Sequence, residues 1–381
     1  MSSPHQYDLI VLGGGCSGLA LGCALAALQT DQKVLIVEAR ASYEDDRSWC
    51  FWERDDHRLA DIVSQRWRLW AYSKLDQPMR QHQLPGYSYQ YIRSIDYYNT
   101  CLDTIDRSKH IRISLGQAVQ ALTQDGNHWL VTTPTETYRA RHVLDTRTPS
   151  RQAIDQALLL QCFVGVEIDL GDTTTLDTST AEIMTHMRTV DGEFCFEYVL
   201  PLAPNRVLAE VTFFARHRMA EPYLSDQLQQ MLGRRGWSSA PVLRREYGVL
   251  PMGLPFPKVA QSGQAMVAGM AAGALRPSSG YGFLRIQAWA QACAEQFHAS
   301  GGLIAQTTSS PIIKHMDSLF LKALRRQPAL APTLFDAMLS RVPPERFIRF
   351  MNDNANWLDC FTVMTSLPTV PFIKALVTAR S

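Results

Sequence analysis

The sequence has no excess of charge of either sign, and this bears on its partners. Its 381 residues include 37 Lys and Arg against 36 Asp and Glu, so the formal net charge is +1. A protein surface that follows a phosphate backbone needs a basic excess, because it must replace the counterions of that backbone. We therefore expect no nucleic-acid partner.

Closely spaced cysteines are missing as well. The eight cysteines are scattered along the chain, at Cys16, Cys23, Cys50, Cys101, Cys162, Cys195, Cys293 and Cys360. This spacing matches neither a zinc site nor a disulfide framework. We expect no metal centre, and a reducing compartment suits the chain best.

No hydrophobic run is long enough to cross a bilayer. The longest, from Ala265 to Leu275, is short and rich in glycine and alanine, whereas a spanning helix needs about 20 apolar residues. The segment from Met1 to Tyr7 lacks the basic-then-apolar order of a signal peptide. The sequence therefore predicts a cytoplasmic location, with peripheral contact at the inner face of a membrane.

What the sequence does contain is the composition of a globular enzyme. Hydrophobic residues make up 46% of the chain and charged residues 19%, which leaves no room for a long disordered region. The length suits a nucleotide-binding domain with a substrate-binding lobe inserted into it.

A dinucleotide-binding fingerprint begins almost at the N-terminus. A buried strand at 7–12 is followed by a small-residue helix at 19–28. The turn between them carries the pattern G-x-G-x-x-G at Gly13, Gly15 and Gly18. Gly13 permits the tight turn, Gly15 lets the backbone approach a pyrophosphate, and Gly18 lets the helix sit close to the sheet.

Two further features of this unit favour a nucleotide. The helix N-terminus, with Cys16 and Ser17, supplies amide donors and a partial positive charge for phosphates. Glu38 ends a second apolar strand, where its carboxylate can accept both hydroxyls of an adenosine ribose. An acid there disfavours NADP, and the extreme N-terminal position favours FAD over NAD. The alternative is a glycine-rich turn without a ligand.

Three charged residues are candidates to border the cofactor. Arg47 lies among the aromatic side chains of the segment from Asp45 to Trp52, and Arg93 lies among the tyrosines of a strand and helix start at 87–98. Asp145 ends a further short strand. For the segment around Arg47, the alternative is that its aromatic side chains are core residues. For Arg93 it is a solvated arginine on a half-buried strand, and for Asp145 it is a plain turn.

A second approach to the cofactor is expected near residue 280. A buried strand leads to Gly269, and the turn with Pro277, Gly280 and Gly282 precedes a helix at 284–300. Backbone amides at such a turn can face a pyrophosphate or an isoalloxazine ring. The competing interpretation is an ordinary helix-starting turn.

These segments predict an α/β protein with an FAD-binding, two-dinucleotide-binding (Rossmann-like) fold. Residues 1–155 and 245–305 are expected to form the FAD-binding domain, and 156–244 an inserted β-rich substrate lobe. Residues 306–381 are expected to form a helical tail.

The helical tail combines apolar residues at helical spacing with several arginines. Its basic residues are Arg325, Arg326, Arg341, Arg346 and Arg349. Apolar residues at this spacing are usually core, but the combination also suits a surface that rests on anionic lipid headgroups.

Several phrases together resemble the flavoprotein lycopene cyclase family of bacteria and plants, over nearly the whole chain. They are Asp46-Arg47-Ser48-Trp49-Cys50-Phe51, Tyr198-Val199-Leu200-Pro201-Leu202-Ala203-Pro204, Leu208-Ala209-Glu210-Val211-Thr212, Glu246-Tyr247-Gly248-Val249-Leu250-Pro251-Met252, Arg276-Pro277-Ser278-Ser279-Gly280-Tyr281-Gly282-Phe283 and Phe320-Leu321-Lys322-Ala323-Leu324-Arg325-Arg326.

This resemblance implies an FAD enzyme that cyclises the ends of a carotenoid, lycopene to γ- or β-carotene, without net electron transfer. The flavin must be reduced, and NAD(P)H serves only to keep it so. An apolar polyene is the implied substrate, and a lipid membrane and other carotenoid enzymes are the implied partners. A monooxygenase or reductase acting on an isoprenoid, or a carotenoid carrier, is the alternative.

The resemblance also assigns roles to single residues. Glu210 occupies the position of an essential acid, and a carboxyl in an apolar slot can be a protonated donor near neutral pH. Aromatic faces, Trp49 and Tyr281 among them, are expected to stabilise a carbocation by cation–π attraction. Thr185 stands where many members carry Asp, and Val211 where some carry a second acid. The final deprotonation is then left to Glu210 itself, the flavin or water.

Overall fold

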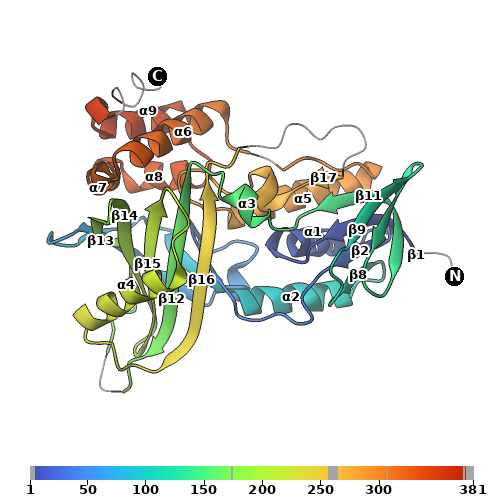
Figure 1. Ribbon diagram of the computed structural model, residues 1–381, viewed down its shortest axis with the longest axis horizontal. Helices are drawn as coiled ribbons and strands as arrows, with labels where there is room; N and C mark the ends of the chain where they lie inside the picture. The colour runs from blue at the N-terminus through green and yellow to red at the C-terminus, as the bar shows by residue number, and fades with distance from the viewer. Residues whose placement is uncertain (1–4, 173–174, 256–264, 307, 372–373, 375–381) are drawn as a thin grey trace.

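The computed structural model describes residues 5–172, 175–255, 265–306, 308–371 and 374. The first four residues, part of the segment in which we expect no signal peptide, lie outside this range. The nucleotide-binding domain occupies one end of the molecule, the lobe the other, and the C-terminal helices lie above the lobe (Figure 1).

The nucleotide-binding domain is built on a largely parallel sheet. Its strand order is β8-β2-β1-β11-β10-β9, with β17 beside β11. The strands are β1 (His5–Leu12), β2 (Val34–Val37), β8 (Ile111–Ser114), β9 (Ala121–Asp125), β10 (His128–Thr132), β11 (Thr137–Asp145) and β17 (Met266–Val267). Helices α1 (Cys16–Ala27), α2 (Ser94–Asp106) and α5 (Phe283–Ser300) belong to this domain. Every residue of β2 is buried, as expected where both faces of a parallel sheet are covered.

The lobe contains a second seven-stranded sheet, in the order β16-β12-β15-β14-β13-β5-β6. Its strands are β5 (Leu69–Lys74), β6 (Arg80–His82), β12 (Leu159–Asp169), β13 (Thr180–Val190), β14 (Glu193–Ala203), β15 (Arg206–Ala215) and β16 (Val242–Met252). A three-stranded sheet joins β3 (Ser48–Arg54), β7 (Tyr87–Arg93) and β4 (Gln65–Trp67).

The helical tail and a few short elements complete the chain. They are η1 (Ala60–Ile62), α3 (Arg151–Ile154), α4 (Glu221–Arg234), η2 (Gly269–Ala272), α6 (Pro311–Arg326), η3 (Pro328–Leu330), α7 (Ala331–Arg341), α8 (Pro344–Met351) and α9 (Trp357–Ser366). No helix in the described residues is both long enough and apolar enough to span a membrane.

The two faces of the lobe sheet have different roles because side chains alternate along a strand. On one face, Val164, Val211 and Phe213 pack with the buried residues of α4, such as Leu228. On the other face, side chains of β14 and β15 such as Phe194 and Phe214 pack with residues of the helical tail such as Phe335. Candidate functional groups are therefore expected on this second face.

The structure confirms the α/β class but corrects the domain bounds. The expected boundary between 244 and 245 cuts β16, which pairs with β12 as far as Met252. Strands β5 and β6 lie within the segment assigned to the nucleotide-binding domain, yet β5 pairs with β13 in the lobe. Pairing between strands so far apart in the chain has no local signal in the sequence.

Candidate active site

The N-terminal glycines form a cradle at the start of α1. Gly13 adopts φ +97°, a conformation that favours glycine. A Cβ at Gly18 would lie 2.1 Å from the Gly13 carbonyl oxygen, whereas a Cβ at Gly15 would meet no atom within 4 Å. Gly18 is thus required by helix–turn packing, and Gly15 leaves open space in front of the helix N-terminus.

Glu38 is held at the rim of this cradle. Its carboxylate accepts hydrogen bonds from the backbone N–H of Gly14 (2.7 Å) and from the backbone N–H (2.8 Å) and Nε (3.0 Å) of Arg40. Burial alone would raise the pKa of Glu38, but the hydrogen bonds from Arg40 and Gly14 lower it. Glu38 is therefore an ionised acceptor in a fixed position.

A second helix N-terminus lies beside the first. Gly269 adopts φ +71°, and a Cβ there would lie 2.8 Å from the Ser17 Oγ. The Gln287 amide near the start of α5 lies 4.0 Å from the Cys16 sulfur at the start of α1, and α5 packs along α1. Both N-termini therefore present their partial positive charge to the same region.

The turn before α5 is shaped by its glycines. Gly280 adopts φ +71°, and a Cβ at that position would lie 2.7 Å from the Gln161 Oε1. A Cβ at Gly282 would lie 2.4 Å from the Leu275 side chain. Pro277 lies between two residues whose side chains bond Asp317 of α6. The turn thus joins the nucleotide-binding domain to both the lobe and the tail.

The other three predicted cofactor contacts are all ion-paired within the protein. Arg47 pairs with Asp46 at 2.6 Å and Arg93 with Asp45 at 2.6 Å. Asp145 pairs with Arg147 at 2.7 Å, and it ends β11 directly beside the end of β1. Asp145 therefore lies at the cradle. Contact of these residues with a cofactor stays a prediction.

Glu210 lies on the β15 face that points away from α4. Its carboxylate accepts a hydrogen bond from the Thr212 hydroxyl at 2.6 Å. The pKa of Glu210 is raised to about 8, chiefly because the carboxyl is buried and further because Glu246 places a second negative charge nearby; Thr212 and Arg244 act in the opposite direction. Glu210 can therefore hold a proton near neutral pH.

Phenols surround this carboxyl. Tyr198 is the cross-strand neighbour of Glu210 on β14, and Tyr281 in the turn before α5 interacts with both. The Tyr281 and Tyr89 hydroxyl oxygens are 3.3 Å apart. Burial raises the pKa of all three tyrosines and of the nearby Cys50 thiol, so these groups are neutral. The charges that act on Glu210 are therefore those of Glu246 and Arg244.

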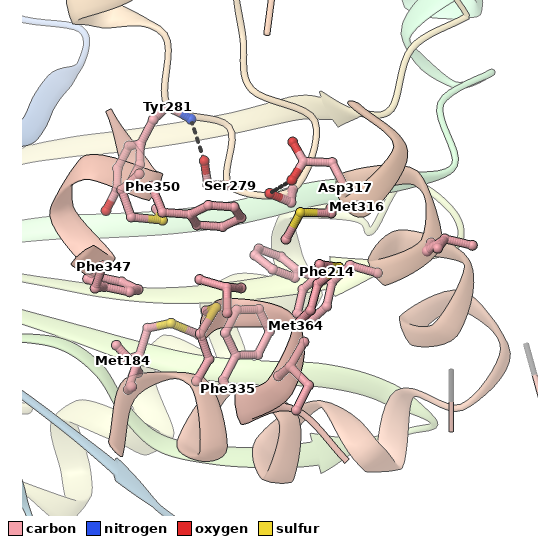
Figure 2. Close-up of a pocket in the computed structure, with 18 of the residues that line it drawn as sticks. Met184, Phe214, Ser279, Tyr281, Met316, Asp317, Phe335, Phe347, Phe350 and Met364 are labelled. Carbon is pink, nitrogen blue, oxygen red and sulfur yellow. Dashed lines mark hydrogen bonds between the residues drawn. The ribbon is translucent and has the colours of Figure 1, made fainter. Parts of the chain in front are cut away.

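An apolar cavity of about 360 Å³ opens next to these tyrosines, between the lobe sheet and helices α6 to α9. Figure 2 shows methionine and phenylalanine side chains facing one another across it. Its apolar lining residues are Trp52, Ile183, Met184, Phe196, Phe214, Ile312, Met316, Leu319, Phe320, Phe335, Met338, Leu339, Phe347, Phe350, Met351, Val363, Met364 and Leu367. Tyr198 and Tyr281 line it too, so the cavity adjoins the surroundings of Glu210.

A buried ion pair joins helix α6, which lines the cavity, to the turn before α5. Arg276, fully buried, donates from Nε (3.2 Å) and Nη2 (3.1 Å) to the two carboxylate oxygens of Asp317. Its guanidinium also donates to the Phe350 carbonyl and lies 4.1 Å from the centroid of that ring. Helices α6 and α8 are therefore tied to the turn that carries Tyr281.

The structure brings only part of the predicted catalytic set together. Tyr281 lies with Glu210, but Trp49 stacks on Phe283 with ring centroids 5.2 Å apart, inside the nucleotide-binding domain. Trp52, three residues later on the opposite face of β3, lines the cavity instead. A strand places alternate side chains on opposite faces, which separates the two indoles.

Thr185 also lies apart from the Glu210 site. Its hydroxyl donates to the Glu182 carboxylate (3.2 Å) and to the Glu197 carbonyl (3.3 Å). Arg235 of the α4 end pairs with Glu182. The structure therefore places Thr185 in an ion-pair network at the α4 side and not at the predicted site.

Sequence reasoning missed the second acid. Glu246 lies within one of the phrases quoted above, but its proximity to Glu210 depends on the order β16-β12-β15. Arg244, which donates to Glu246 at 3.1 Å, was missed for the same reason. The available signal was an acid and an arginine two residues apart in an alternating strand.

The fold and the site define an α/β protein of the dinucleotide-binding class, with an apolar cavity beside a half-buried carboxyl. A flavoprotein/dehydrogenase from Cytophaga hutchinsonii has the same fold, with a TM-score of 0.64 at 13% identity over 99% of this chain and 100% of that one. A geranylgeranyl bacteriochlorophyll reductase-like protein from Thermoplasma acidophilum matches with a TM-score of 0.60 at 12% identity, over 98% and 96% of the two chains.

Sequence comparison identifies the family within this class. The family model described as lycopene cyclase protein matches residues 8–377. Lycopene beta-cyclase of Pantoea ananas is 24% identical, over 98% of this chain and 97% of its own length. The chain therefore belongs to the lycopene cyclase family, as the resemblance of its sequence phrases predicted.

Proposed function

We propose that this protein is an FAD-dependent lycopene β-cyclase, which closes rings at the ends of a linear carotenoid to give γ- and β-carotene. The observation that carries the proposal is the carboxyl of Glu210, whose pKa is raised to about 8 beside an apolar cavity. The three relatives found by sequence all bear the name lycopene beta-cyclase. A hydrocarbon substrate and a proton donor are what such a reaction needs.

The proposed reaction moves protons and forms one carbon–carbon bond. Glu210 gives its proton to the terminal double bond of the polyene, which leaves a tertiary carbocation. A neighbouring double bond donates its electron pair to that carbon and closes the six-membered ring. Loss of a proton from the carbon next to the new cationic centre restores an alkene. Substrate and product are isomers, and no electrons are gained or lost.

The cavity supplies the surroundings that a carbocation requires. Its walls are mostly aliphatic, aromatic and thioether side chains, which disfavour the water that would otherwise add to the cation. The Trp52 and Tyr281 rings contact one another edge to face, with centroids 5.7 Å apart, at the Glu210 end. Aromatic faces stabilise a cation by about 0.5–2 kcal/mol each.

The residues at the cradle fit FAD. The open space before Gly15 and the paired N-termini of α1 and α5 suit a pyrophosphate, and the ionised Glu38 suits a ribose. A reduced flavin bound there would add negative charge that stabilises the cation, with NAD(P)H as its reductant. The protein residues then orient the polyene and hold the proton at Glu210.

Membrane contact is proposed through α9. Its side chains Trp357 (72% exposed), Leu358, Phe361 and Met364 present apolar surface to solvent, and Met364 also lines the cavity. A polyene that enters from a bilayer would meet this helix first. An exposed apolar patch of this kind is typical of interfacial binding.

Three arginines of the tail make hydrogen bonds within the protein. Arg349 donates two hydrogen bonds to Asp359, at 2.8 and 2.7 Å, and Arg346 donates to the Thr362 hydroxyl at 3.1 Å. Arg341 donates to the Ser366 carbonyl at 3.1 Å. These three hold α9 in place, so the membrane proposal rests on the apolar side chains of α9.

The test is an anaerobic incubation of the purified protein with lycopene, reduced FAD and liposomes. The proposal expects γ- and β-carotene, with no stoichiometric consumption of NADPH. A product that forms only with oxygen would point to a monooxygenase instead. Glu210→Gln is expected to retain FAD and lose at least about 100-fold in turnover. If the unmodified protein binds lycopene but never converts it, the protein is a carrier.

A further inference from the structure

Two carboxyl groups face each other across a glycine in the lobe sheet. In the register of the strands, Gly165 of β12 is opposite Glu210 of β15 on one side and opposite Glu246 of β16 on the other. A Cβ built on Gly165 would lie 3.3 Å from the Glu210 Cβ and 3.3 Å from the Glu246 Cγ. Because Gly165 has no side chain, nothing of β12 on this face stands between the two acids.

The two acids have unequal hydrogen-bond partners. Glu246 accepts from the Ser48 hydroxyl (3.0 Å) and from Arg244 Nη1 (3.1 Å), whereas Glu210 accepts from the uncharged Thr212 hydroxyl (2.6 Å). A carboxylate that accepts a charge-assisted hydrogen bond is stabilised in its ionised form. Burial raises the pKa of Glu246 as well, but Arg244 and Ser48 oppose that rise. The negative charge of the pair therefore belongs on Glu246 and the proton on Glu210.

The other groups around the pair leave this assignment unchanged. Tyr198, Tyr281 and Cys50 near Glu210 are neutral, as described above. On the Glu246 side, Arg244 also lies 3.3 Å from Glu167 and 3.4 Å from Asp45, and it donates to the Tyr91 hydroxyl at 3.0 Å. The positive charge of Arg244 is therefore shared among Glu246, Glu167 and Asp45, so it does not fully cancel the negative charge of Glu246.

We propose that Glu246 is a positioning residue for ring closure: as the ionised member of the pair across Gly165, it keeps the proton on Glu210. The inference rests on the proposed function. Once Glu210 has given its proton to the polyene, two carboxylates face each other at Gly165, and their repulsion favours recapture of one proton. The proton that ring closure releases returns to Glu210, so the pair ends each turnover as it began.

The experiment compares Glu246→Gln with Glu167→Gln in the flavin-loaded protein. Both substitutions remove one buried carboxylate next to Arg244, but only Glu246 is opposite Gly165. The protein is labelled with ¹³C-glutamate, and the infrared carbonyl band of the protonated carboxyl is followed against pH; Glu210→Gln identifies the band by its loss. This readout does not depend on turnover.

The pair of Glu210 and Glu246 predicts how the pH midpoint of the infrared band differs among these proteins. The band of the unmodified protein should titrate near pH 8, the value to which the pKa of Glu210 is raised. Glu246→Gln should lower the midpoint by about one pH unit or more, because a neighbouring negative charge is lost, and Glu167→Gln should change it by less than about a third of that. The alkaline limit of cyclisation should move by the same amount as the band.

Two results would overturn the inference: an unchanged midpoint in Glu246→Gln, or equal shifts in the two variants. If Glu246→Gln fails to fold, Glu246→Ala provides the second variant, because it removes the same neighbouring negative charge. It should lower the midpoint too, and an unchanged midpoint there also refutes the pair. A protein that shows the predicted midpoints but cyclises nothing would refute the proposed function alone.

Discussion

Replacement of Glu210 by glutamine should abolish ring closure and, at the same time, raise the free energy of unfolding above neutral pH. The pKa of Glu210 rises from its ordinary value of 4.5 to about 8, because of burial first and the charge of Glu246 second. Between these two pH values the folded protein retains a proton that the unfolded chain has released. Folded-state stability therefore falls as pH rises through this window.

The size of the effect follows from the shift. At 1.36 kcal/mol for each pKa unit, a rise from 4.5 to about 8 gives a ceiling of about 5 kcal/mol at and above pH 8. Glu210 keeps some contact with solvent, and Gln preserves only one acceptor for Thr212, so we expect about 2 to 3 kcal/mol. Below pH 4.5 both states are protonated, and the variant should gain nothing.

The assay is urea unfolding of the two proteins from pH 4.5 to pH 9 at one fixed FAD concentration, followed by far-ultraviolet circular dichroism. The difference in free energy should grow with pH and level off near pH 8. A variant that is less stable than the unmodified protein at pH 8, or equally stable at every pH, would refute the assignment of Glu210 as an acid with a raised pKa. Stability gained at the expense of activity is typical of a strained active-site group.

Three further results are expected. Asp317→Ala should lower the free energy of unfolding by about 3–5 kcal/mol in urea titrations, because it leaves the buried Arg276 without its partner; a loss below about 1 kcal/mol would contradict the role given to this ion pair. Gly15→Ala should keep the unfolding midpoint but lose FAD affinity at least about tenfold in fluorescence titrations. Gly18→Ala should lose stability, because its methyl group would lie 2.1 Å from a carbonyl oxygen. Equal behaviour of the two variants would contradict the roles given to these glycines. Trp357→Ser should weaken flotation with liposomes while changing the free energy of unfolding by no more than about 0.5 kcal/mol; unchanged flotation would remove the support for α9 as the membrane contact.

The sequence by itself determined whatever depends on neighbours along the chain. The turn of Gly13, Gly15 and Gly18 and the acid that follows it at Glu38 form one local unit, and its geometry is dictated by backbone sterics and helix–strand spacing. The helical tail and the β-rich character of the lobe were predictable from hydrophobic period for the same reason, whereas β13 and β16 were not predicted as strands. Glu210 could be proposed as the acid only because a sequence phrase around it resembles a known family.

Only the tertiary structure decided which side chains share a site. Glu246 lies opposite Gly165 because β12 pairs with both β15 and β16, and Trp52 replaces Trp49 at the cavity because alternate residues of β3 face opposite ways. Thr185 points into the ion pairs beside α4 for a similar reason. Strand order and register are set by burial summed over many distant contacts, so no segment of the chain carries them alone.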